Sequence, residues 1–186
     1  MRATTRSGVA AAVLLSAAVC ASCSSPPESP PPRPATSSTS STPTVSADPQ
    51  AATKTKIIEA YKGFLTERDE LLSHPYSIKG VQLTSFASGE ALERVYAAAI
   101  AYRRNGIYLR GAVKTNPVVS ELNISKMGST VVDCLDSSQA LPFFERTGKS
   151  ALAPNQPLRV TVIATVQNER GHWLVTKWIP DRRKSC

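Results

Sequence analysis

Hydrophobic residues change their spacing along the chain, and these changes predict where its elements begin and end. After Lys54, apolar side chains recur every three or four positions, which is the period of an amphipathic helix. Pro75 ends this first helix, because a residue that precedes proline is disfavoured in the helical conformation. A second helix is predicted with Ser88 as its N-cap and Gly106 as its C-terminal stop. Its apolar stripe consists of Leu92, Val95, Tyr96, Ala99 and Tyr102.

After Gly106 the spacing becomes that of β-strands. Strands are predicted over residues 107–113, 118–125, 130–136 and 141–145. Residues 159–179 then predict two long strands joined by a tight turn. Helices followed by a run of antiparallel strands predict an α+β fold, with the N-terminal helices packed on a curved, mainly antiparallel sheet.

The long hairpin carries apolar residues on both of its faces. In its first strand one face is formed by Val160, Val162, Ala164 and Val166. In its second strand, Trp173, Val175, Lys177 and Ile179 alternate with Leu174, Thr176 and Trp178. This pattern predicts a hairpin that is central to the sheet and covered on both sides.

The N-terminus has the pattern of an export signal. Arg2 and Arg6 precede an apolar run from Val9 to Val19, which is too short to cross a bilayer, since that takes about 20 residues. The Ala21-Ser22 pair before Cys23 resembles the lipobox of bacterial lipoproteins, although Cys20 stands where that pattern prefers leucine. In that family the cysteine is acylated and becomes the first mature residue.

This resemblance implies that residues 1–22 are a lipoprotein signal peptide and that Cys23 is lipidated. The protein would then be anchored to the outer face of the cell membrane. An ordinary cleaved signal, which would give a secreted protein, is the alternative. Residues 23–53 are rich in Pro, Ser and Thr and lack aromatic residues, which predicts a disordered tether before a domain at 54–186.

The net charge of +8 would suit nucleic acid, an anionic membrane surface or an acidic polymer. The expected location excludes nucleic acid as a partner. A tight basic cluster stands near the C-terminus, at Arg182, Arg183 and Lys184. These three residues are predicted to contact an anionic surface.

Several short segments carry a resemblance to a known group. They are Tyr96–Tyr102 (YAAAIAY), Gly106–Gly111 (GIYLRG), Val131–Asp136 (VVDCLD) and Gly171–Val175 (GHWLV). In this order, after a first helix, they resemble secreted actinobacterial lipoproteins with the nuclear-transport-factor-2-like fold. The resemblance implies a curved sheet wrapped around a long helix, forming a cone, over residues 53–186. That group includes ketosteroid isomerase, limonene epoxide hydrolase and members that only bind, so the fold does not supply the function.

The cysteines fit an oxidising compartment. If Cys20 is removed with the signal and Cys23 is acylated, Cys134 and Cys186 remain as a pair and predict a disulfide. It would close a loop of about fifty residues, worth on the order of 4 kcal/mol in the chain-entropy model. A zinc site that also used the two histidines is the alternative. No Cys-x-x-Cys or His-x-x-x-His spacing supports it, so we predict no metal and no cofactor.

Two functions are compatible with these features. The first is a non-catalytic domain that binds a protein, a lipid or a wall component through the cone mouth or the basic tail; the ligand is not specified. The second is a small-molecule isomerase or hydratase, which needs a tyrosine donor and a carboxylate of tuned pKa inside the cone.

The candidate pocket residues are Tyr61, Tyr96, Tyr102 and Asp133. The tyrosines lie on helix stripes predicted to face the sheet. Asp133 and Asp136 are three residues apart in one strand, so they point to opposite faces and at most one enters the cone. A cavity of about 300 Å³ or more, with one of these carboxylates opening into it, would favour the enzyme. No catalytic residue is assigned.

Overall fold

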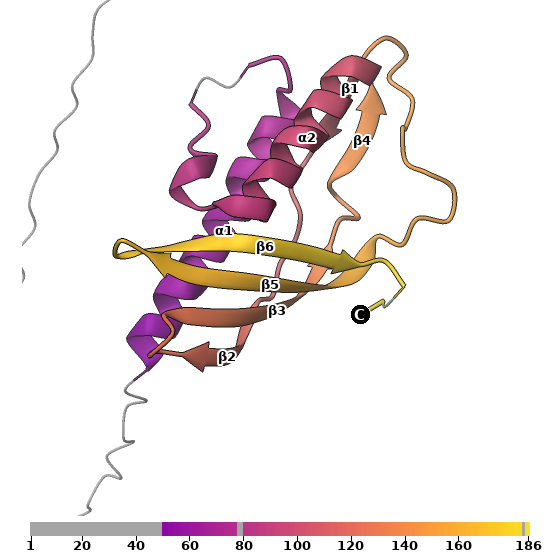
Figure 1. Ribbon diagram of the computed structural model, residues 1–186. Helices are drawn as coiled ribbons and strands as arrows, with labels where there is room; N and C mark the ends of the chain where they lie inside the picture. Colours follow the sequence, from indigo (N-terminus) through magenta and orange to yellow (C-terminus); the bar gives the residue numbers. More distant parts are fainter. Residues whose placement is uncertain (1–49, 78–79, 184) are drawn as a thin grey trace, which may run out of the picture. The chain divides into compact units, whose positions relative to one another are not determined.

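A computed structural model describes residues 50–77, 80–183 and 185–186 of the chain. The predicted signal peptide, the lipidation site at Cys23 and nearly all of the predicted tether lie outside these residues, as does Lys184. Within the described part of the chain, no helix is both long enough and apolar enough to cross a membrane. The described residues form an α+β domain (Figure 1).

The first helix, α1, spans Ala51–Ser73, so the last three residues of the predicted tether are helical. It ends before Pro75 as predicted, with His74 as its C-cap. Its buried face contains two charged residues, Arg68 and Asp69, besides the expected apolar side chains. Phe86 packs directly on the α1 backbone at Gly63, where an added Cβ would lie 2.4 Å from the Phe86 ring.

A 3-10 turn, η1 (Leu83–Ser85), leads into the second helix, α2 (Gly89–Asn105). The Gly106 C-cap is confirmed, because Gly106 adopts the left-handed conformation with a φ of 60°. Ser88 occupies the N-cap position, but its hydroxyl does not cap the helix. It donates instead to Glu169 Oε1 of β5 at 2.7 Å. The Ser88 backbone N–H donates to the carbonyl of Val175 in the adjoining strand β6.

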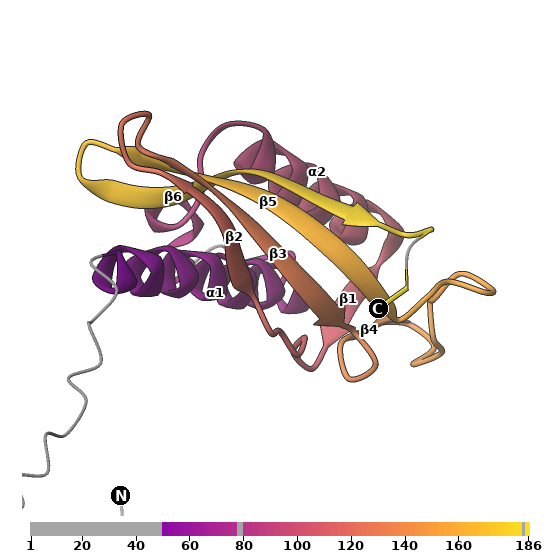
Figure 2. The same ribbon diagram turned by 90° about the horizontal axis from the view of Figure 1, so that it is seen from below.

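The main sheet has four antiparallel strands in the order β2-β3-β5-β6. These strands are β2 (Val118–Asn123), β3 (Gly128–Asp136), β5 (Arg159–Glu169) and β6 (His172–Asp181). A separate antiparallel pair joins β1 (Ile107–Arg110) to β4 (Leu141–Phe144). Figure 2 shows that the main sheet is curved and that both helices lie on one side of it.

The hairpin of β5 and β6 forms as predicted, with Arg170 and Gly171 at positive φ in its two-residue turn. The apolar face of β5 is confirmed, since Val160, Val162, Ala164 and Val166 are all buried. The prediction of a central, doubly covered hairpin is wrong. β6 is an edge strand, and on the face without helices the paired Ile163 and Ile179 are 50% and 42% exposed.

The predicted alternation along β6 is also wrong in its second half. Thr165 pairs with Lys177, but the next residue of β5, Val166, pairs with Val175, so β6 contains one extra residue. Such a bulge reverses the faces of the residues that follow it. Val175 therefore faces the core before the bulge, and Trp178, opposite Ala164, faces it afterwards.

The predicted disulfide between Cys134 and Cys186 is present, with a Cα–Cα distance of 5.7 Å. Cys134 lies on β3, between the inward-facing Asp133 and Leu135. The bridge therefore ties the tail that follows β6 to a strand two places away in the sheet.

Candidate ligand-binding cavity

A cavity of about 520 Å³ opens where α1, α2, β1 and the segment before β5 meet the end of β6. Most of its lining is apolar. Its larger apolar side chains include Leu72 of α1, Val95 of α2, Ile107 and Leu109 of β1, Leu135 of β3, Leu152 of the segment before β5, and Trp178 of β6. The volume falls within the range of about 300–1,000 Å³ that is typical of small-molecule sites.

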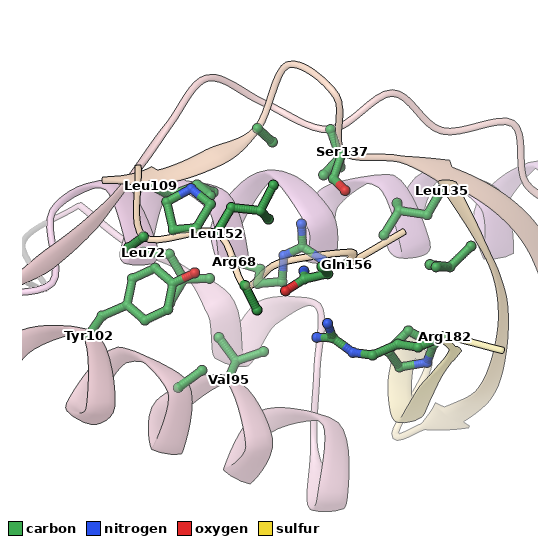
Figure 3. A pocket seen from close by; sticks show the side chains of 18 of the residues that line it. Arg68, Leu72, Val95, Tyr102, Leu109, Leu135, Ser137, Leu152, Gln156 and Arg182 are labelled. Atoms are coloured by element: carbon green, nitrogen blue, oxygen red, sulfur yellow. The ribbon is translucent and has the colours of Figure 1, made fainter. Parts of the chain in front are cut away.

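Six polar or charged residues also line the cavity. They are Arg68, Arg94, Tyr102, Ser137, Gln156 and Arg182. No acidic residue is among the described residues that line it. Figure 3 shows Arg68, Gln156 and Arg182 gathered in one part of the cavity and Tyr102 entering it from α2. The lining thus combines an apolar wall with hydrogen-bond donors of positive charge.

Arg68 is buried, at 8% exposed, and contacts within the protein fix its guanidinium. Its Nε and Nη2 both donate to Asp69 Oδ1, and its guanidinium lies 5.0 Å from the centre of the Trp178 ring. Asp69 is fixed in turn by the backbone N–H of Val113, which donates to its second oxygen at 3.0 Å. The other N–H groups of Arg68 make no hydrogen bond within the described residues. Burial of the charge is therefore offset by its partner, while donors remain free on the cavity side.

The hydroxyl of Tyr102 makes no hydrogen bond within the described part of the chain. Partial burial raises the pKa of Tyr102, and the positive charges of Arg68 and Arg182 oppose that rise. Tyr102 therefore remains a neutral donor and acceptor at physiological pH. The two opposing effects also mean that both arginines lie within electrostatic range of this hydroxyl.

Asp133 is buried, at 2% exposed, and differs from Arg68 and Tyr102 because both of its side-chain oxygens accept hydrogen bonds within the protein. Its Oδ2 accepts from the Tyr61 hydroxyl at 3.0 Å and from Thr115 Oγ1 at 2.6 Å. Its Oδ1 accepts from the backbone N–H of Asn116 at 2.7 Å. Burial first, and then the negative charge of Asp133, raise the pKa of Tyr61 well above its usual range. We call these four residues the Asp133 cluster; none of them lines the cavity.

The buried indole N–H of Trp178 has no hydrogen-bond partner of normal geometry within the described residues. It nevertheless lies close enough to the Tyr61 hydroxyl to lower the pKa of Tyr61, against the larger effects of burial and of Asp133. The Trp178 ring thus lies between the Asp133 cluster and the cavity. Its N–H is near Tyr61 of the cluster, and the Arg68 guanidinium packs over its face.

The structure divides the predicted pocket residues. Tyr102 lines the cavity, whereas Tyr61 and Asp133 bond to each other outside it. The prediction for Tyr96 is wrong, because its side chain is 39% exposed and does not line the cavity. Val95 and Ala99, four residues apart, form the buried line of α2, and Tyr96 lies about 100° around the helix from Val95.

Asp136 points away from the interior, which confirms the prediction that only one of the two strand carboxylates is inward. It does not line the cavity. The backbone N–H of Ser138 donates to its Oδ1 at 2.8 Å, and hydrogen bonds from Ser138 lower the pKa of Asp136. The cavity therefore exists without a carboxylate that opens into it.

The basic cluster is likewise divided. Arg182 lines the cavity, while Arg183 is exposed and its Nε lies 3.5 Å from Asp181 Oδ1. Lys184 lies outside the described residues.

Sequence reasoning missed Arg68 and Gln156 as cavity residues. The available signal was Arg68 itself, an arginine within an otherwise apolar helical stripe.

Among the described residues, His, Cys, Asp and Glu side chains do not gather in groups of three that could hold a metal ion. His74 pairs with Glu70 on the surface of α1, with 3.3 Å between Nδ1 and Oε1. Both cysteines of the alternative zinc site are in the disulfide. That alternative is therefore incompatible with the structure.

Comparison with known proteins adds little to this geometry. No family model matches the sequence, and no curated protein is similar enough to count as a relative. Among solved structures, the intermembrane-space region of the chloroplast protein ARC6 aligns with a TM-score of 0.47 and 10% sequence identity. The alignment covers 68% of this chain and 95% of that one. A likeness at this level supports no conclusion about function.

Proposed function

We propose that this chain is a lipoprotein, anchored through Cys23 to the outer face of the cell membrane, whose α+β domain binds a small apolar molecule without catalysis. The observation that carries the binding function is the cavity of about 520 Å³ with a largely apolar lining. The Cys134–Cys186 disulfide supports an extracytoplasmic location, because such bonds persist in oxidising compartments.

The domain is further proposed to be a nuclear-transport-factor-2-like cone. The long helix α1 and the curved antiparallel sheet over it support that assignment. A cone of this kind would place the cavity at its open end, beside the C-terminal part of α1 that carries Arg68 and Leu72. A bound ligand would then enter from the side where the segment before β5 and the tail after β6 meet.

The isomerase or hydratase alternative receives no support from the arrangement of side chains. It needs a carboxylate that reaches the substrate, and neither Asp133 nor Asp136 lines the cavity. Asp133 already accepts three hydrogen bonds, so releasing it would leave three donors without an acceptor. Tyr102 alone provides a donor but no base.

Cavity binding is tested by filling the cavity. Ala98 lines it from α2, and its neighbour Ala97 is exposed on the same helix. The neutral dye Nile red serves as an apolar probe, followed by fluorescence titration with circular dichroism as a check on folding. We expect Ala98→Phe to weaken dye binding at least about tenfold and Ala97→Phe to leave it unchanged. Equal binding by all three proteins would reject the cavity as the site.

The anchor is tested separately. Mass spectrometry of the protein from a bacterial host is expected to show a diacylated N-terminal cysteine at position 23. Cys23→Ser is expected to move the protein from the membrane to the soluble fraction. An unacylated N-terminus would reject the lipoprotein assignment and leave the cavity proposal intact.

A further inference from the structure

We infer that the cavity selects an amphiphile with a single negative charge, with its head at Arg182, Arg68 and Tyr102 and its apolar body on the aliphatic wall. This inference rests on the proposed binding function and names the class of ligand. It is carried by the placement of charges around the cavity and by the donors there that have no partner in the protein.

The three arginines of the lining are not equivalent. Arg68 is neutralised by Asp69, and Arg94 is paired with Glu90, with 2.7 Å between Nη2 and Oε1. Arg182 makes no ion pair with another described residue. No acidic side chain among the described lining residues compensates it. Arg182 is therefore the arginine of the described lining that has no ion-pair partner, and its positive charge matches one negative charge on a ligand.

The donors around that charge are arranged for an oxygen-rich head. Free N–H groups of Arg68 and the amide of Gln156 lie in the part of the cavity that Arg182 enters, and the unbonded hydroxyl of Tyr102 enters the cavity from α2. A guanidinium offers paired N–H donors that fit the oxygens of a carboxylate or phosphate ester. Asp69 and Trp178 hold Arg68 in place before any ligand arrives, so little ordering is needed on binding.

Arg182 is exposed, so it stands at the mouth of the cavity and not in its depth. A head that binds there keeps part of its hydration, and the desolvation cost that accompanies a buried charge is reduced. The apolar body then extends along Leu72, Val95 and Leu109. A neutral chain gains the same apolar burial but leaves the donors without a charged acceptor.

The experiment compares decanoate with decanol by isothermal titration calorimetry at pH 8, where the carboxylate is ionised. The full chain is used with Cys23→Ser, which prevents acylation and removes the need for detergent. We expect decanoate to bind at least about tenfold more tightly than decanol. Arg182→Gln is expected to weaken decanoate binding about three- to tenfold and to leave decanol unchanged, because only the charged head contacts Arg182.

Arg183→Gln is the matched control, since Arg183 is the exposed neighbour that does not line the cavity. It is expected to leave both affinities unchanged. Raising the salt concentration from 50 to 500 mM should narrow the difference between decanoate and decanol in the wild type but not in Arg182→Gln. Decyl phosphate, tested alongside, distinguishes a carboxylate head from a phosphate head: the tighter binder of the two identifies the preferred chemistry.

The possible failures are distinguishable. If decanol binds but decanoate binds no more tightly, or if Arg182→Gln and Arg183→Gln behave alike, the anionic head site is rejected and the apolar cavity stands. If the wild type binds neither decanol nor Nile red, the cavity function itself is rejected.

Discussion

The Asp133 cluster and the cavity place polar groups in the interior in opposite ways. In the cluster, one carboxylate accepts three hydrogen bonds, and none of the four residues lines the cavity of about 520 Å³. In the cavity, Arg68 and Tyr102 retain donors that no described residue accepts. Helix α1 supplies both regions, since Tyr61 and Arg68 are seven residues, or two turns, apart on one face. A satisfied buried polar group stabilises the fold, whereas an unsatisfied one beside empty volume marks a place for a ligand.

The largest expected effect comes from removing the centre of the Asp133 cluster. Asp133→Ala leaves the Tyr61 hydroxyl, the Thr115 hydroxyl and the Asn116 N–H without their acceptor. We expect it to lower the free energy of unfolding by about 3–5 kcal/mol, measured by urea denaturation. Asp136→Ala, on the outer face of the same strand, is the control and should cost less than about 1 kcal/mol. Equal losses would show that the cluster does not stabilise the fold.

The second largest effect is expected from removing the disulfide, which links the strand of the Asp133 cluster to the tail that carries a residue of the cavity. The disulfide joins Cys134, the neighbour of Asp133, to the tail that carries Arg182. Replacing both cysteines by serine is expected to lower the free energy of unfolding by about 4 kcal/mol in the chain-entropy model. In the protein that remains folded, decanoate affinity should fall to the level of Arg182→Gln. An unchanged decanoate affinity would mean that the tail stays in position without the bridge.

A smaller effect is expected for Tyr61→Phe, which removes one of the three donors to Asp133. The free energy of unfolding should fall by about 1–2 kcal/mol at pH 8. Because burial and Asp133 raise the pKa of Tyr61 in the folded state, its contribution is fully present below the unfolded pKa of about 10. It is lost as the pH rises above that value, since the unfolded chain then releases the proton and the folded chain does not.

Urea denaturation at pH 8, 10 and 11 measures this alkaline loss. The wild type should lose more stability between pH 8 and 11 than Tyr61→Phe does. Tyr96→Phe, which alters an exposed tyrosine, should keep the slope of the wild type. A Tyr61→Phe protein with the wild-type slope would contradict the assignment.

The smallest effect concerns packing beside the cavity. Leu152→Ala should lower the free energy of unfolding by less than about 1 kcal/mol, because one side of Leu152 already faces empty volume. Leu71→Ala, in the packed core, should cost about 2–5 kcal/mol. Chemical denaturation of the two variants checks the difference. A loss at Leu152 as large as that at Leu71 would indicate that the cavity is closed in solution.

Predictions that depend on one helix, one turn or one strand alone were reliable. The end of α1 before Pro75, the left-handed Gly106, the buried face of β5 and the opposite directions of Asp133 and Asp136 all follow from the geometry of a single helix, turn or strand. The reversal of faces along β6 was not predictable in this way. It depends on which residue of β5 each residue of β6 opposes, and a bulge changes that register without leaving a clear signal in the alternation.

The sequence alone predicted the α+β class and the order of its elements, because these depend on local periodicity. It predicted the pairing of Cys134 with Cys186 from the expectation that Cys20 is removed and Cys23 acylated, and the structure contains that disulfide. Tertiary structure decided which polar groups are satisfied. The approach of Tyr61, Thr115 and Asn116 to Asp133 joins three separate segments, so no local pattern reveals it. The same holds for the cavity, because Arg68 and Arg182 both line it although they are more than a hundred positions apart in the sequence. Sequence periodicity shows which residues turn inward, but only the packed chain decides whether each one meets a partner or an empty space.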